Sequence, residues 1–172
     1  MSTTGQSPAA ATPRDFDATK KAADSGDAVA QYNLGVMYRD GEGVPQDYAE
    51  AMKWFRLAAE QGDTTAKYNL GVMYRDGLGV PQDYAEAVKW SRLAAEQGDA
   101  EAQCDLGLMY LSGLGVPQDD AEAYAWISVA ATSGSEDASS NRDLVASKLT
   151  PEQLSKAQKR ATELFEKYGI ED

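Results

Sequence analysis

The sequence predicts an all-α fold, an α-solenoid of three helix-turn-helix repeats with a period of 36 residues. The segment Gly-x-Gly-Val-Pro-Gln-Asp occurs three times, beginning at Gly41, Gly77 and Gly113. A fixed period of roughly 20–50 residues is typical of stacked-repeat proteins. Before the first segment, apolar residues recur at the i, i+4 spacing of an amphipathic helix, as at Ala30 and Leu34. One helix pair cannot bury both of its apolar faces alone, so we expect consecutive pairs to stack.

Each repeat contains the start and stop signals of two helices, which we call helix A and helix B. We expect Asp27 to cap the first helix A and Gly41 to end it, because glycine adopts the left-handed conformation that helix ends favour. Asp47 then caps helix B, with Glu50 at the spacing of a capping box, and Gly62 ends that helix. The predicted repeats are 28–63, 64–99 and 100–135.

Two residue types recur inside the predicted helices. A glycine lies in the middle of each helix A, where it costs about 1 kcal/mol, and we expect the close approach of a neighbouring helix to compensate. A tryptophan lies in each helix B, and we expect it to fill the space between layers. These residues are Gly35, Gly71 and Gly107, and Trp54, Trp90 and Trp126.

The chain before the first full repeat is expected to hold a tail and half a repeat. Residues 1–11 are small and polar, which predicts a disordered tail. Thr12 and Pro13 match the cap and first position of a helix. The Gly-Asp pair that follows each helix B also occurs at Gly26, so this helix is an isolated helix B. We expect one solenoid domain over residues 12–172.

Residues 136–172 are expected to close the C-terminal end of the array. The period decays there, and we interpret 136–147 as a degenerate helix A. Residues 150–153 form a capping box with proline at the first helical position, which predicts the start of a last helix. Repeat arrays need an end that covers their open core, so we expect this helix to be a structural cap. Its apolar stripe is Leu154, Ala157, Ala161, Leu164, Phe165 and Tyr168.

The composition excludes several classes of function. The net charge is −12, whereas nucleic acids and anionic membranes attract basic surfaces, so we expect neither as a partner. With no histidine and one cysteine, Cys104, the chain lacks a structural zinc set, a Ser/His/Asp set and an intrachain disulfide. The Gly-x-Gly segment lacks the strand of a dinucleotide site and the lysine of a P-loop. We therefore expect no catalytic, cofactor or metal site.

The sequence leaves the cellular location open. No segment approaches the ~18 consecutive apolar residues of a membrane span, so no membrane insertion is expected. Residues 1–12 lack the basic start and apolar core of a signal peptide. The protein is cytoplasmic if Met1 is the native start, and periplasmic or secreted if a signal peptide has been removed. We expect a monomer.

The repeated motif resembles a known family. Ala-x-x-x-Leu-Gly-x-x-Tyr-x-x-Gly-x-Gly-Val-Pro-Gln-Asp, followed by Ala-x-x-Trp-x-x-x-Ala-Ala-x-x-Gly, extends from Asp27 to Gly134 in three copies. This pattern is similar to the Sel-one-like repeat (SLR) family, a relative of the tetratricopeptide repeats. The resemblance implies a right-handed α-solenoid and an adaptor role in protein complexes. A cysteine-rich branch of the family is linked to penicillin binding, but Gln31 and Ala59 replace its cysteines here.

One face of each helix A is the candidate binding surface. In related tetratricopeptide arrays, the face of helix A opposite its apolar stripe lines a concave groove, and we carry that geometry over by analogy. Tyrosine and arginine dominate interface hot spots, and asparagine can both donate to and accept from an extended backbone. An ordinary solvated face is the alternative. The predicted groove residues are Tyr32, Asn33, Val36 and Arg39 in the first repeat, Tyr68, Asn69, Val72 and Arg75 in the second, and Cys104, Asp105 and Leu108 in the third.

The charges of these residues predict a modest gradient along the groove. Arg39 and Arg75 lie one period apart and should point the same way, toward an acidic group of a partner. Glu101 and Asp105 should attract a basic group. We interpret Cys104 as a packing or groove residue, because no cation beside it would lower its pKa.

The leading functional hypothesis is a non-enzymatic protein–protein interaction module. It would bind a protein or peptide segment in its concave groove, in a bacterial context as an adaptor, a secretion-linked factor or a toxin-neutralising partner. A purely structural or idealised repeat array without a dedicated partner is the first alternative. A hydrolase of the cysteine-rich SLR type is the second, and the scattered carboxylates of the sequence offer it little support.

Overall fold

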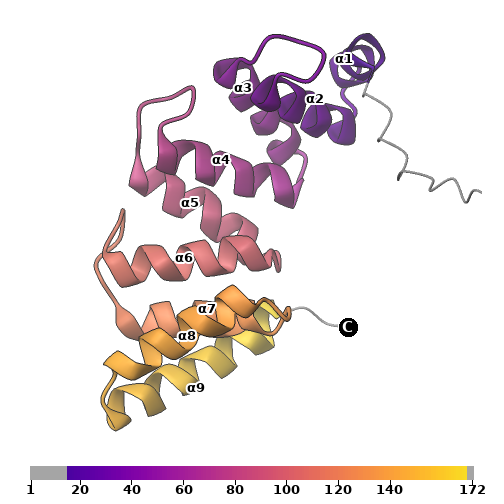
Figure 1. Cartoon of the computed structure of the whole chain (residues 1–172). Coiled ribbons are helices and arrows are strands. Elements are labelled where there is room, and N and C mark those ends of the chain that lie inside the picture. Colours follow the sequence, from indigo (N-terminus) through magenta and orange to yellow (C-terminus); the bar gives the residue numbers. More distant parts are fainter. Residues whose placement is uncertain (1–14, 170–172) are drawn as a thin grey trace, which may run out of the picture.

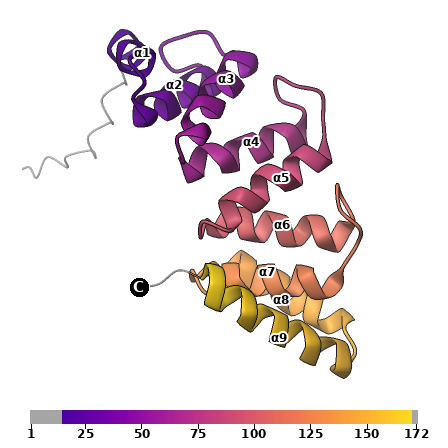
Figure 2. The same cartoon turned by 180° about the vertical axis from the view of Figure 1, so that it is seen from behind.

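The computed structural model describes residues 15–169, and within them it contains nine α-helices and no β-strand (Figure 1). The helices are stacked so that α1 and α9 lie at opposite ends of an elongated array (Figures 1 and 2). The predicted all-α solenoid is confirmed. The helices are α1 (Phe16–Asp24), α2 (Ala28–Asp40), α3 (Tyr48–Glu60), α4 (Thr64–Asp76), α5 (Tyr84–Ala95), α6 (Ala100–Ser112), α7 (Asp120–Ala131), α8 (Glu136–Lys148) and α9 (Pro151–Tyr168).

The N-terminal helix begins later than the sequence suggested. The predicted start at Thr12 and Pro13, and the tail at 1–11, lie outside the described residues. Helix α1 begins at Phe16, after Asp15, whose carboxylate accepts hydrogen bonds from two backbone N–H groups of the first turn. Asp15 therefore takes the capping role that Thr12 was expected to have.

The helix boundaries follow from the caps of each repeat. Asp27 accepts a hydrogen bond from the N–H of Ala30, and Gly41 ends the helix in the left-handed conformation, with φ of 72°. Asp47 caps α3, but Glu50 lies near Lys53 Nζ, at 3.4 Å, instead of completing the expected capping box. Equivalent aspartates cap the helices of the second and third repeats, and Gly77 and Gly113 end α4 and α6. Helix α3 ends one residue before the predicted Gly62, with Gln61 as its C-cap.

The central glycines permit the close helix pairing that the sequence predicted. A Cβ atom on Gly107 would lie 2.5 Å from Cγ1 of Ile127 and 3.0 Å from the carbonyl oxygen of Ala123. A Cβ atom on Gly35 would lie 2.7 Å from the ring of Phe55. Each helix A thus packs against its own helix B, while α3 contacts α4 and α5 contacts α6 to join the repeats.

Aromatic side chains hold successive layers together. Trp54 is buried and packs with Ala23 of α1 and Leu34 of α2, between the half-repeat and the first repeat. Trp126 is 1% exposed, and its ring stacks on Tyr168 of α9, with centroids 5.7 Å apart. The expected role of the tryptophans between layers is confirmed for these two residues.

A hydrogen bond from helix B also links successive repeats. Nη2 of Arg56 donates a hydrogen bond of 2.8 Å to the hydroxyl of Tyr74 in the next repeat. Arg92 makes the equivalent 2.6 Å bond to Tyr110, one period later. Both tyrosines are half-buried against the core.

The C-terminal helices α8 and α9 both pack against α7 (Figure 2). The capping box at Thr150 is present, and only Leu149 and Thr150 separate α8 from α9. Nε of Arg160 lies 2.5 Å from a carboxylate oxygen of Glu122 on α7. Ala157 and Leu164 of the predicted stripe are buried, whereas Phe165 is 45% exposed, so the stripe is narrower than expected.

The connector glycine Gly115 offers a direct test of the stacking geometry. Its φ is 71°, and a Cβ atom there would overlap the carbonyl group of Tyr84 at the start of the preceding helix B. At Gly134, φ is 85° and no atom lies within 4 Å of the same position. Gly134→Ala should therefore cost only the backbone penalty of about 1–2 kcal/mol. Gly115→Ala should cost at least about 1 kcal/mol more, because a backbone clash is added.

Urea unfolding of the two single variants measures this difference in the free energy of unfolding. Equal losses for Gly115→Ala and Gly134→Ala would show that the connector does not press on the preceding helix as the structure describes.

Candidate functional site

The eleven predicted groove residues lie on α2, α4 and α6, and we call the surface that they form the groove face. Val36 and Asn69 are buried and the other residues are half-buried, so none is fully exposed. The reason is packing against adjacent helices. The ring of Tyr32, for example, lies 5.8 Å from the ring of Phe55. The groove face is therefore a partly packed surface and not a freely solvated one.

On the groove face, an arginine from one A helix reaches the next A helix. Nη1 of Arg39 donates a 2.6 Å hydrogen bond to Oδ1 of Asn69, and Nη1 of Arg75 lies 2.6 Å from Oδ2 of Asp105. Each arginine also pairs with the aspartate that follows it in the sequence. The two arginines point the same way, as expected. Arg75 and Asp105, which were expected to attract opposite groups of a partner, are bonded to one another, so these two charges compensate each other within the protein.

The protonation behaviour of this pair reflects its partial burial. Hydrogen bonding to Asp76, and then the nearby charge of Asp105, raises the pKa of Arg75 above its usual value. Burial raises the pKa of Asp105, and Arg75 opposes that shift. Arg75 is therefore charged at any ordinary pH, and its charge is paired with Asp76 and Asp105 within the protein.

The two asparagines differ in what they can offer a partner. Asn69 is 8% exposed, and its Nδ2 donates a 2.8 Å hydrogen bond to the carbonyl oxygen of Thr65 while its Oδ1 accepts from Arg39. Asn33 is half-buried and has no hydrogen-bond partner among residues 15–169. Asn33 can therefore bind an added backbone directly, whereas Asn69 would first have to give up internal bonds.

A pocket of about 510 Å³ brings part of the groove face together with the start of α8. It unites three of the predicted residues, Tyr68, Cys104 and Asp105. Leu108 does not line it and packs instead against the cluster formed by α7, α8 and α9. The pocket is also lined by Ala100, Glu101, Ser133, Ser135, Asp137 and Ala138. We call it the third-repeat pocket.

Two side chains of the third-repeat pocket, Tyr68 and Cys104, have raised pKa values. Burial, and then the charges of Asp105 and Glu101, raise the pKa of Tyr68 to about 12. Burial raises the pKa of the Cys104 thiol, which lies 3.8 Å from Nδ2 of Asn141. Both groups are therefore neutral near pH 7, and Cys104 lacks the thiolate that a nucleophile requires.

Sequence reasoning missed the contribution of α8 to this pocket. Ser133, Ser135 and Asp137 were assigned to the last loop and the C-terminal cap, yet they form one wall of the pocket. The 36-residue period could have predicted it. Asp137 lies one period after Glu101 and should therefore lie beside it on the next A helix. This equivalence was not recognised because the repeat motif is weak after residue 135.

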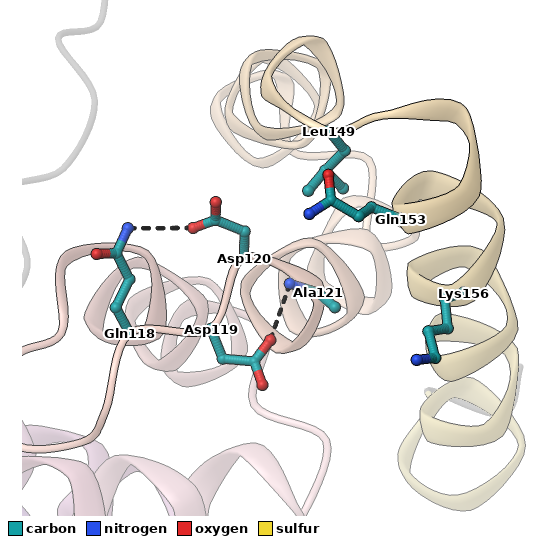
Figure 3. A pocket seen from close by; sticks show the side chains of 7 residues that line it. All are labelled: Gln118, Asp119, Asp120, Ala121, Leu149, Gln153 and Lys156. Carbon is teal, nitrogen blue, oxygen red and sulfur yellow. Dashed lines mark hydrogen bonds between the residues drawn. The ribbon is translucent and has the colours of Figure 1, made fainter.

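A second pocket, of about 350 Å³, lies where the start of α7 faces the start of α9 (Figure 3). Its polar groups are engaged in capping. Oδ1 of Asp119 accepts a 3.0 Å hydrogen bond from the N–H of Ala121, and Nε2 of Gln118 donates a 3.3 Å hydrogen bond to Asp120. Lys156 lines the side that α9 contributes. Asp119 thus caps the start of α7, and we assign this pocket a structural role.

Residues 15–169 contain neither a cluster of metal ligands nor a helix that could span a membrane. No three His, Cys, Asp or Glu side chains in this range gather in a way that could hold a metal ion. None of the helices in the described part of the chain is both long and apolar enough to cross a membrane.

The chain is similar in structure to two solved bacterial proteins. A Sel1 repeat protein from Oxalobacter formigenes is 40% identical, with a TM-score of 0.68, over 76% of this chain and 98% of that protein. A protective antigen present in uropathogenic Escherichia coli strains, which displays an SLR fold, is 32% identical with a TM-score of 0.61. That match covers 90% of this chain but only 41% of the antigen, so this chain spans less than half of the antigen's length.

The family comparison agrees with the period and the stacking. No curated protein matches the chain. The Sel1 repeat model matches three consecutive segments, at residues 28–63, 64–99 and 100–135, which are the three repeats derived from the sequence. Together these segments make up more than half of the chain, and their helices form the stacked pairs described above. The chain belongs to the Sel1 repeat family.

Proposed function

We propose that this protein is a non-enzymatic interaction module that binds a protein or peptide segment along the groove face, in an adaptor or scaffold role. The observation that carries the proposal is the third-repeat pocket, a hollow of about 510 Å³ walled by α4, α6 and the start of α8. Binding sites are concave and combine apolar walls with a few placed polar groups. This pocket has such a composition, with the ring of Tyr68 beside several carboxylates.

The rest of the groove face can guide an extended segment toward this pocket. The bonds Arg39–Asn69 and Arg75–Asp105 fix neighbouring A helices relative to one another, so the surface is ordered before a partner arrives. A preorganised surface loses less entropy when it binds. Asn33 has free hydrogen-bonding groups for a partner's backbone at the other end of this surface.

The titratable groups favour binding over catalysis. The raised pKa values of Tyr68 and Cys104 keep both groups protonated at neutral pH, so neither is a ready base or nucleophile. The protein is proposed to act as a single copy, with its groove face open to the partner.

A pair of matched charge substitutions tests where the partner binds. Val72 is half-buried on the groove face, and Leu93 is 40% exposed on helix B of the same repeat. Val72→Lys places a charge on the groove face and should weaken the binding of a partner recovered from extracts of the source cells at least ~10-fold, or ~1.4 kcal/mol. Leu93→Lys makes the same change in charge elsewhere and should leave the affinity unchanged.

Calorimetric titration of both variants with that partner gives the affinities, and circular dichroism shows whether each variant is folded. If Leu93→Lys weakens binding and folded Val72→Lys does not, the partner uses the helix B surface, and the proposal fails.

A further inference from the structure

The third-repeat pocket exists because large side chains have been replaced by small ones at one place. Cys104 occupies the position that holds tyrosine in the first two repeats, namely Tyr32 and Tyr68. Ser133 occupies the position of Gln61 and Gln97. A tyrosine at 104 would extend into the space that the pocket now occupies, since Cys104 lines it. The divergence of the third repeat has therefore created the cavity.

The glutamine that Ser133 replaces is a bridging residue in the other repeats. Oε1 of Gln97 accepts hydrogen bonds from Thr64 at 3.0 Å and from Lys67 at 2.8 Å. Ser133 cannot span that distance, and its hydroxyl donates instead to the carbonyl oxygen of Ala130, at 2.7 Å. The third repeat therefore lacks, between α6 and the end of α7, the bridge that links α4 to the end of α5 in the second repeat.

The same divergence makes the pocket negative. Glu101 replaces the Val29 and Thr65 of the earlier repeats, while Asp105 replaces an asparagine. Asp137 adds a third carboxylate from α8. Arg75 is the cation paired with Asp105, whereas Glu101 and Asp137 have no ion-pair partner among residues 15–169. The raised pKa of Tyr68 reflects the partial burial of its ring together with the charges of Asp105 and Glu101.

A buried acceptor in the third repeat also lacks a donor. Oε1 of Gln103 has no hydrogen-bond partner within the described chain, although the side chain is fully buried. In the first repeat, the same atom of Gln31 accepts a 2.7 Å hydrogen bond from Nε2 of Gln61. The residue equivalent to Gln61 is Ser133, which lines the pocket. The third repeat therefore keeps a buried acceptor on Gln103 whose donor in the first repeat is replaced by Ser133. An unsatisfied buried acceptor of this kind lowers stability.

We propose that the third-repeat pocket binds an arginine side chain of the partner segment. This inference rests on the proposed interaction function and specifies the chemistry of the partner. A guanidinium group supplies five N–H donors and a positive charge, which matches a pocket rich in acceptors and carboxylates. Its planar face stacks on an aromatic ring, here Tyr68, and a lysine ammonium does this less well.

The probe is a blocked pentapeptide, acetyl-Ala-Ala-Arg-Ala-Ala-amide, titrated into the full ¹⁵N-labelled chain. The expected result is a set of amide shift changes centred on Glu101, Cys104 and Asp137. The same peptide with citrulline has nearly the same shape but no charge, and it should bind at least ~10-fold more weakly, a loss of ~1.4 kcal/mol.

Two variants link any binding to the pocket. Cys104→Tyr restores the residue that the first two repeats have at this position, so the fold should accommodate it. The added ring should fill the pocket and abolish binding of the arginine peptide. Cys104→Ala keeps the pocket open and should bind the arginine peptide as the unmodified chain does. Ser133→Gln restores the bridging glutamine and is a second, independent way to close the pocket.

The proposal is overturned if the arginine peptide causes no shift changes at the pocket, if citrulline binds equally well, or if folded Cys104→Tyr still binds. These outcomes are distinct from a failure of the proposed function. If Val72→Lys weakens the binding of the partner but Cys104→Tyr leaves its affinity unchanged, the groove face binds the partner without an arginine in this pocket.

Discussion

Removal of α9 by truncation after Leu149 should lower the free energy of unfolding by about 5 kcal/mol. Helix α9 covers Trp126 and Val129 of α7, and it contributes Leu164 to the same core cluster. Losing the burial of a large apolar side chain costs roughly 1.5–3 kcal/mol, and three such side chains are affected here. The truncated protein should also expose the core of the third repeat and become less soluble, because a solenoid needs a polar end. Urea unfolding and light scattering measure the two effects.

Two neighbouring residues on α9 provide the matched control. Leu164 is 2% exposed and Phe165 is 45% exposed, although the sequence places both on the apolar stripe. Leu164→Ala should cost about 2–5 kcal/mol. Phe165→Ala should cost clearly less, because much of that ring already contacts water. If the truncated protein stays monomeric and unfolds at the same urea concentration as the full chain, α9 does not act as a cap.

Replacement of Trp126 by alanine should cost about 3–5 kcal/mol of stability. The indole is 1% exposed and stacks on the ring of Tyr168, with an interplanar angle of 21°. Its Nε1 has no hydrogen-bond partner within residues 15–169, so the expected loss comes from packing. The cavity would lie between α7 and α9, and α9 should loosen with it. Equilibrium unfolding gives the total loss, and hydrogen exchange shows whether α9 is affected.

The control is the equivalent residue of the second repeat. Trp90 is half-buried and, among residues 15–169, makes no ring stack of the kind that Trp126 makes with Tyr168. Trp90→Ala should therefore cost less than Trp126→Ala. An equal or larger loss at Trp90 would show that α9 adds nothing to the packing of Trp126.

Much of the fold could be predicted because each physical cause lies close to its effect in the sequence. The capping aspartates and the connector glycines are local signals, and the period repeats them three times. Gly107 marks a close helix contact because glycine in mid-helix has a cost that must be compensated. The expected half-repeat was also found, although α1 begins at Phe16 and not at Thr12.

The candidate site was less predictable because it depends on contacts between repeats. Arg75 and Asp105 were assigned opposite roles toward a partner, yet they bond to one another over 2.6 Å. Their separation of 30 residues is shorter than one period, and only the stacking of the second repeat on the third brings them together. Asp137 was missed for the same reason. It reaches the pocket through α8, whose own repeat pattern is weak.

The most direct test of an interaction module is to locate its partner on the surface. Amide hydrogen exchange of the full chain, with and without the partner recovered from extracts, reports which helices become protected. We predict slower exchange in α4, α6 and the first turn of α8, with the largest change around Cys104, and no change in α3 or α5. Protection confined to α3 and α5, or no protection on any A helix, would contradict binding along the groove face.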